Sequence, residues 1–224
     1  MKIQGVGLID FKKQNHKTNN VRFNFCAKNK FDSFERTTKA PTITTALKMQ
    51  GEAMAKEGKA VYKKACKVQK DVQKNLDLVW QNFNPMLDEN DIEIYDENTQ
   101  QLKISAQVFD KTISMREYYD DKIAKDIYIS GDFVGVCVYE QDGKMTSYEF
   151  DRETKKPISC LSDSKTDELS LIADKAYFYD KNGKLKTIYY DYNRTLGKIS
   201  ASEIYEFKNG KLINFIDCTS GIEG

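Results

Sequence analysis

The stretch AYFYDKNGKLKTIYYDYN, residues 176–193, is followed by a near copy, EIYEFKNGKLINF, residues 203–215. Each copy places aromatic and β-branched residues on both sides of Asn-Gly, and residues of this kind favour half-buried strands. Asn-Gly is a strong hairpin signal because a type I′ turn needs positive φ at both central residues. The two copies therefore predict two neighbouring β-hairpins.

The same pattern extends over most of the chain. Gly143 to Gly183 is 40 residues and Gly183 to Gly210 is 27, close to three and two times a strand-plus-turn unit of about 13.5 residues. Asp120-Asp121 and Asp142-Gly143 mark further turns, and twelve of the thirteen tyrosines follow residue 90. We expect an antiparallel meander over residues 91–218, with about eleven strands spanning about 50 Å.

Before this region, residues 44–83 show a helical pattern. Apolar residues recur every seven positions in two interleaved series, and together they draw one apolar stripe along a helix. The series are Leu47, Met54, Val61, Val68 and Gly51, Gly58, Ala65, Val72. The two glycines lie on the stripe, which indicates close approach of another backbone. Asn84-Pro85 should end the helix, because the residue before proline disfavours the α conformation.

These elements predict an α+β fold, in which the long amphipathic helix packs on a large curled antiparallel meander. A helix of 40 residues is about 60 Å long, enough to cross the whole sheet. An open sheet this wide is expected to twist and curl. We expect a single domain over residues 44–224, preceded by a basic, largely irregular lead-in over residues 1–43.

Composition is that of an ordinary soluble protein. The chain has 224 residues, of which 40% are hydrophobic and 31% charged, and no apolar run approaches the roughly 20 residues of a membrane span. Net charge is +1, yet residues 1–84 sum to +10 and residues 85–224 to −9. The five cysteines are scattered and the N-terminus lacks a secretory pattern, so we expect reduced thiols and a cytoplasmic location.

Signals for chemistry are weak. His16 is the only histidine, which argues against a histidine triad or a multi-histidine zinc site. Residues 88–98, DENDIEIYDEN, lack the glycine of an EF-hand loop. No phosphate-binding glycine motif is present, and no pair of carboxylates is selected by its spacing. We therefore predict no catalytic residue, no metal and no cofactor.

Residues 134–218 resemble the YD and MORN-variant repeat proteins. In those proteins the motif Tyr-x-x-x-Gly-Lys/Arg-Leu recurs many times and forms meandering sheets. The resemblance rests on Tyr139/Gly143/Met145, Tyr179/Gly183/Leu185 and Tyr205/Gly210/Leu212. It implies protein binding, since some MORN-variant proteins are classed as antitoxins or immunity-like partners. The opening residues resemble uncharacterised proteins of gut bacteria related to cyanobacteria. A helix before a curled sheet is also similar to the lipoprotein-carrier fold, whose members hold acyl chains.

Three functional hypotheses follow. The first is a non-enzymatic module that presents a sheet face or edge to a protein partner, with exposed tyrosines as anchors. Its candidate residues are Tyr148, Tyr177, Tyr179, Tyr190, Tyr192 and Tyr205. The second is a carrier of an apolar small molecule or lipid in the gap between the helix and a concave sheet, which an unfilled apolar space beside Gly51 and Gly58 would favour.

The third hypothesis is binding to an anionic surface, either membrane or nucleic acid, through a basic helix face. Its candidate residues are Lys56, Lys63, Lys67, Lys70 and Lys74. No aromatic residues that could stack on bases are interleaved with these lysines, so we expect no specific nucleic acid partner.

Overall fold

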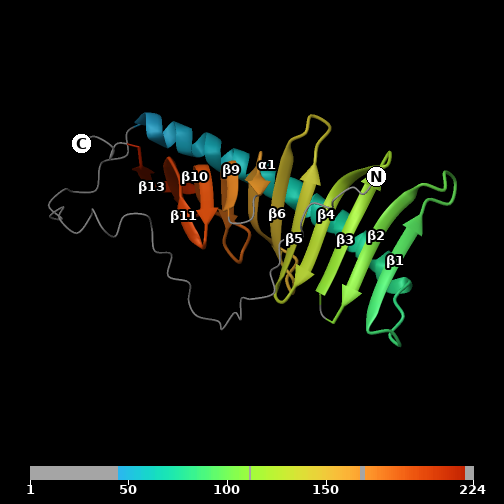
Figure 1. Ribbon diagram of the computed structural model, residues 1–224. Coiled ribbons are helices and arrows are strands. Elements are labelled where there is room, and N and C mark those ends of the chain that lie inside the picture. The colour runs from blue at the N-terminus through green and yellow to red at the C-terminus, as the bar shows by residue number, and fades with distance from the viewer. Residues whose placement is uncertain (1–44, 111, 167–169, 220–224) are drawn as a thin grey trace.

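The structure is a computed structural model that describes residues 45–110, 112–166 and 170–219. The predicted lead-in over residues 1–43, with His16, lies outside the described residues. The described residues form one helix, α1 (Thr45–Gln81), and one antiparallel sheet of thirteen strands (Figure 1).

The strands follow one another along the sheet almost in chain order. The path runs β1-β2-β3-β4-β5-β6-β7-β9-β10-β12-β13, while β8 pairs with β9 and β11 pairs with β10. Their bounds are β1 (Glu89–Tyr95), β2 (Leu102–Phe109), β3 (Thr112–Tyr119), β4 (Lys122–Ser130), β5 (Phe133–Tyr139), β6 (Met145–Asp151), β7 (Pro157–Ser162), β8 (Lys165–Thr166), β9 (Ser170–Tyr179), β10 (Leu185–Thr195), β11 (Lys198–Ser200), β12 (Glu203–Lys208) and β13 (Lys211–Asp217).

The predicted fold class, α+β with a curled sheet, is wrong. The described part of the chain is mostly antiparallel sheet with a single helix, and the sheet is open, with β1 at one end of the path and β13 at the other. Figure 1 shows α1 running behind the sheet as one rod, from β13 at its N-terminal end to β1 at its C-terminal end. Strands that all contact one extended rod stay side by side along it, so the sheet does not curl round on itself.

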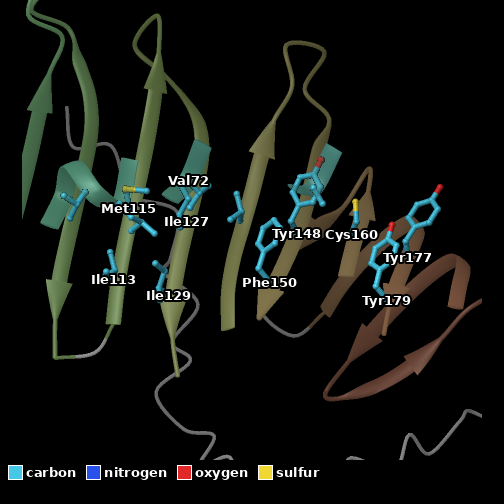
Figure 2. Close-up of a cluster of buried hydrophobic side chains, with 14 of the residues drawn as sticks. Val72, Ile113, Met115, Ile127, Ile129, Tyr148, Phe150, Cys160, Tyr177 and Tyr179 are labelled. Atoms are coloured by element: carbon cyan, nitrogen blue, oxygen red, sulfur yellow. The ribbon is translucent and has the colours of Figure 1, made fainter. Parts of the chain in front are cut away.

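One row of side chains crosses the whole sheet beneath this helix. The eleven strands of the path are paired so that each contributes one residue to the row, directly opposite its neighbours. All belong to the main hydrophobic core, and several are visible in Figure 2. In path order the row is Ile92, Ala106, Met115, Ile127, Val136, Tyr148, Cys160, Tyr177, Ile188, Tyr205 and Phe215.

The seven-residue repeat of α1 matches the spacing of the strands. Seven helical residues rise about 10.5 Å, and two strand spacings measure about 9.6 Å. Gly51 lies against Leu212 of β13, and Gly58, seven residues later, lies against Leu185 of β10, two strands away along the path. The buried residues Gly51, Gly58, Ala65, Val72 and Val79 continue the same repeat. The helix therefore meets the sheet at regular intervals of two strands.

The turn into β1 is held by an asparagine pair. The backbone N–H of Asn84 donates to the Asn90 Oδ1 at 2.7 Å, and the Asn90 Nδ2 donates back to the Asn84 carbonyl at 3.1 Å. Asn90 is buried, so both ends of its amide are used. These bonds fix where the first strand begins relative to the end of the helix.

The turns differ in part from the type I′ expectation. Asp120-Asp121 and Asn209-Gly210 have positive φ at both central residues, as predicted. At Asp142-Gly143 and Asn182-Gly183 only the glycine has positive φ. At the second of these turns the Asp180 Oδ1 accepts from the N–H groups of Asn182 and Lys184 at 2.8 and 2.9 Å, and at the first the Asp142 Oδ1 accepts from the N–H of Lys144 at 3.1 Å. A side-chain oxygen that accepts hydrogen bonds from backbone N–H groups in this way stabilises a longer turn.

A smaller second core lies on the sheet face opposite α1. Tyr189 and Tyr192 pack edge-on at 5.7 Å between ring centroids, and Phe178 contacts both rings. Leu161, Ala176 and Ile204 complete this cluster. The sheet is therefore buried on both faces over β7 to β12, whereas the opposite face over β2 to β5 adds no residue to either core.

Replacing the two helix glycines tests the close approach. A Cβ at position 51 would lie 2.6 Å from Leu212 Cβ, whereas at position 58 it would meet the flexible Leu185 Cδ2 at 2.8 Å. Gly51→Ala should lower the free energy of unfolding by about 1–3 kcal/mol through overpacking, although alanine favours a helix by about 1 kcal/mol. Gly58→Ala should change it less, because Leu185 can rotate. Urea unfolding measures both, and a stabilised Gly51→Ala would contradict this packing.

Candidate functional site

The six tyrosines predicted as exposed anchors are not exposed. Five of them are buried, and Tyr190 is half-buried. Tyr148, Tyr177 and Tyr205 belong to the row beneath α1, and Tyr179 faces the helix from the same strand as Tyr177. Tyr192 belongs to the opposite core, because Asp191 adopts a positive φ of 49° and shifts the alternation of β10. The expectation of solvent-facing tyrosines is therefore not met.

Two of these tyrosines form hydrogen bonds with α1 outside the cleft described below. The Tyr179 hydroxyl donates to the Gly58 carbonyl at 2.9 Å. The Tyr205 hydroxyl donates to Glu203 at 2.8 Å and accepts from the Gln50 amide at 3.1 Å. Both hydroxyls are thus engaged in holding α1 against the sheet.

The other three helix-facing tyrosines meet at a cleft. Tyr148, Tyr177 and Tyr190 line a hollow of about 670 Å³ between α1 and strands β6, β7, β9 and β10, and the helix contributes Glu57, Val61 and Lys64. Figure 2 shows Tyr148, Cys160 and Tyr177 side by side on successive strands. A volume of several hundred Å³ is typical of small-molecule sites.

A charged network closes one side of this cleft. The Glu57 Oε1 accepts from Lys175 Nζ at 2.9 Å and from the Tyr177 hydroxyl at 2.6 Å. Lys175 Nζ also lies 4.7 Å from the centre of the Tyr190 ring, within the range of cation–π attraction. Burial alone would raise the pKa of Glu57, but the hydrogen bonds from Lys175 and Tyr177 outweigh it and lower that pKa.

Tyr148 stands apart from this network. It is only 1% exposed, and its hydroxyl has no hydrogen-bond partner among the described residues. Burial raises the pKa of Tyr148, so the group stays a neutral hydroxyl. A buried polar group without a partner costs about 1–3 kcal/mol, and native structures contain few of them.

The uncompensated charges of the cleft are acidic. Lys64 pairs with Glu140 at 3.1 Å and Lys175 pairs with Glu57. Asp174 and Asp191 also line the cleft, both are exposed, and neither forms an ion pair with a described residue. The lining therefore attracts cations.

Cys160 lines the same cleft but is poorly suited to nucleophilic chemistry. It is buried, and burial raises the pKa of its thiol to about 12. The thiolate is the reactive form of cysteine, and it is scarce at neutral pH with such a pKa. Within the described part of the chain, no group of three or more His, Cys, Asp or Glu residues is placed to hold a metal ion.

The space directly beside the two helix glycines is filled, whereas the hollow between α1 and strands β6 to β10 lies next to it. Leu212 occupies the position beside Gly51 and Leu185 the position beside Gly58. A second hollow, between α1 and strands β3 to β6, measures about 180 Å³ and is lined by Val72, Leu76 and Trp80. That is below the range of about 300–1,000 Å³ that ligand pockets usually show.

The basic face predicted for the helix is exposed. Lys56, Lys63, Lys67, Lys70 and Lys74 all face solvent, and Lys59, omitted from the prediction, joins them. Their spacing of three and four residues aligns them along one line of the helix. We call these six residues the lysine stripe; it is about 27 Å long. None of the six forms an ion pair with a described residue.

Comparisons with known proteins give little. No protein-family model and no curated protein matches the chain. A crystal structure of S. aureus TarM, a mutant in complex with fondaparinux, α-GlcNAc-glycerol and UDP, is similar at 12% identity and a TM-score of 0.28, over 58% of this chain and 27% of that one. A second TarM structure gives 13% identity, a TM-score of 0.27 and coverages of 61% and 27%. This chain thus spans about a quarter of TarM, and so distant a likeness supports neither an enzyme nor a non-enzyme.

Among the described residues, no helix is long and apolar enough to span a membrane.

Two tyrosine-to-phenylalanine variants test the unpartnered hydroxyl. Tyr148→Phe removes a hydroxyl without a partner, so the free energy of unfolding should stay equal or rise. Tyr179→Phe removes the bond to the Gly58 carbonyl and should lower that free energy by about 1 kcal/mol. Urea unfolding compares them directly. If Tyr148→Phe lowers the free energy of unfolding as much as Tyr179→Phe does, the Tyr148 hydroxyl must have a hydrogen-bond partner.

The Glu57 network predicts acid sensitivity. A carboxyl whose pKa is lower in the folded state stabilises it above the unfolded pKa, and that contribution is lost as pH falls through the folded pKa. The ordinary value for Glu57 is 4.5 and the shift is downward, so the loss falls below about pH 4.5. Glu57→Gln should be less stable than the parent at neutral pH, and the difference should shrink in acid. Unfolding curves over this pH range check it, and a constant difference would contradict it.

Proposed function

We propose that the protein is a non-enzymatic interaction module that binds an acidic protein along the lysine stripe of α1. The observation that carries this proposal is a row of six exposed lysines without an ion-pair partner among the described residues. The exposed acids on the same helix beside or flanking the row, Glu52, Asp71 and Asp77, form no ion pair with a described residue. An acidic surface of similar length would compensate the charge of the whole row.

The fold holds the lysine stripe rigid, so it suits a partner whose acidic surface is also rigid. The apolar side of α1 is packed on the sheet along its whole length, so the lysines are held on a straight support. An acidic helix with carboxylates every three or four residues would present the same repeat. Complementary charge of this kind raises the association rate and fixes orientation more than it raises affinity.

Acidic protein is favoured over the two other polyanions. A membrane-surface helix inserts an apolar face into the lipid, but here the apolar stripe of α1 is buried against the sheet, and its exposed large apolar residues are Met49 and Trp80, 31 positions apart near its two ends. Single-stranded nucleic acid is held by aromatic residues beside the charges, and the lysine stripe has none between Lys56 and Lys74 apart from Tyr62, which packs edge-on against Tyr179 instead. The resemblance to YD and MORN-variant proteins also implies protein binding.

The sheet face remains a second candidate surface. Over β2 to β5 the face opposite α1 carries Arg116, whose Nε donates to Asp126 at 3.0 Å, and Tyr139, whose hydroxyl donates to the same carboxylate at 2.8 Å. Tyr139 is 40% exposed. Tyrosine and arginine are enriched at the centres of protein interfaces.

Charge reversal tests the lysine stripe. Lys63→Glu, Lys67→Glu and Lys70→Glu together should weaken binding to immobilised polyglutamate at least about tenfold, and binding by the parent should fall as salt is added. The matched control reverses Lys103, Lys122 and Lys198, which are exposed outside α1 and change the net charge equally. The control should bind like the parent. Circular dichroism verifies that both variants keep their helix.

Binding to competing polyanions distinguishes an acidic protein from the other possible classes of partner. Duplex DNA and vesicles rich in phosphatidylserine are offered at the same salt concentration. Preferential retention on polyglutamate supports the proposal, and equal or better retention on DNA or vesicles overturns it. If the control reversal weakens binding as much as the stripe reversal, net charge explains the effect and the lysine stripe is not the site. Loss of binding on Tyr139→Ser alone would assign the site to the sheet face.

A further inference from the structure

The cleft beneath α1 carries features that packing of the core does not require. The row beneath the helix is apolar over β1 to β5 and again at Ile188 of β10. The three strands between them, β6, β7 and β9, contribute Tyr148, Cys160 and Tyr177 instead. In the next row the paired residues Lys175 and Tyr190 line the same hollow. A space-filling core would place aliphatic side chains at these positions, as β3 and β4 do. The polar groups are therefore gathered around an opening.

The Tyr148 hydroxyl marks the inner end of this opening. The residue lines the cleft and is 1% exposed, and none of the described residues accepts or donates a hydrogen bond at its hydroxyl. Its neighbour Tyr177 shows the contrast, because Tyr177 donates to Glu57 at 2.6 Å. Tyr148 can therefore donate to, or accept from, a polar group that enters the cleft.

Asp174 and Asp191 mark the outer end. They lie on the paired strands β9 and β10, next to the register pairs Lys175–Tyr190 and Ala173–Tyr192. Both are exposed, whereas the two lysines of the lining are already neutralised by Glu57 and Glu140. The two ends of the cleft thus differ: a neutral hydroxyl lies inside, and two carboxylates that form no ion pair with a described residue lie at the rim.

We propose that this cleft binds a small aromatic amine, with its ammonium group between Asp174 and Asp191 and a polar group at its other end bonded to the Tyr148 hydroxyl. Between the two ends, Val61 and Tyr177 offer apolar and aromatic surface, against which a ring packs well. An anionic ligand is disfavoured because no unpaired cation lines the cleft. A purely apolar ligand would leave the buried Tyr148 hydroxyl without a partner.

Four probes of the same size separate these contributions. Tyramine carries both the ammonium and the phenol; phenethylamine lacks the phenol, tyrosol lacks the charge, and 4-hydroxyphenylpropionate carries a negative charge instead. Binding is followed by the methyl resonances of Val61, which lines the cleft, with those of Val72, which lines the smaller hollow, as an internal control. We expect tyramine to shift Val61 saturably with a dissociation constant of about 0.1–10 mM. Phenethylamine and tyrosol should bind about tenfold more weakly, and the anion should not bind.

Variants of the chain assign each end. Asp174→Asn with Asp191→Asn should reduce the affinity for tyramine to that for tyrosol, and Tyr148→Phe should reduce it to that for phenethylamine. Tyr179→Phe and Asp91→Asn, outside the cleft, should leave it unchanged. The proposal is overturned if no probe shifts Val61, which would mean that only water enters, or if the anion binds as well as tyramine. Because these variants leave the lysine stripe intact, failure here is distinct from failure of polyglutamate binding.

Discussion

The structure depends on the contact between one straight helix and one row of side chains that crosses the sheet. Each strand on the path places one residue in that row, from Ile92 in β1 to Phe215 in β13. Seven residues of helix rise about as far as two strands are wide, so a residue every seventh position meets an equivalent place on the sheet. A single hydrophobic interface therefore holds strands that are far apart in the sheet, and it does so without closing the sheet into a barrel.

Side-chain size along the helix is complementary to side-chain size along the sheet. The buried series on α1 grows from its N-terminal end, in the order Gly51, Gly58, Ala65, Val72 and Val79. Leu212 and Leu185 fill the space beside the two glycines, and the row beneath the helix holds aromatic residues over β13 to β6 (Phe215, Tyr205, Tyr177 and Tyr148) but none over β5 to β1. The cleft lies where this change occurs, since the tyrosine hydroxyls there need polar partners. The lysine stripe is the other consequence, because a helix with one side fully packed presents its charges on the remaining side.

The sequence reveals the parts of this arrangement that depend on local periodicity. Glycines seven residues apart indicate a close approach, and Asn209-Gly210 indicates a tight turn with positive φ at both residues. The sequence does not reveal which face each tyrosine takes, because the positive φ of Asp191 breaks the alternation of β10, so that Tyr190 packs against the main core and Tyr192 lies in the opposite one. Nor does it reveal the cleft, since Glu57 and Lys175 are 118 positions apart and meet only through the packing of α1 on β9. The predicted fold class was wrong for a related reason. The expectation of a curled sheet rested on the width of the sheet alone, and it did not consider that all the strands pack against one extended helix.

The correspondence between helix positions and strands is tested most directly by nuclear Overhauser contacts between selectively labelled leucine methyls and glycine α-protons. The account predicts that the Leu212 methyls contact Gly51 and the Leu185 methyls contact Gly58, with no contact from Leu185 to Gly51. Contacts from Leu185 to Gly51, or the absence of leucine contacts at both glycines, would show that α1 lies in a different register or away from the sheet.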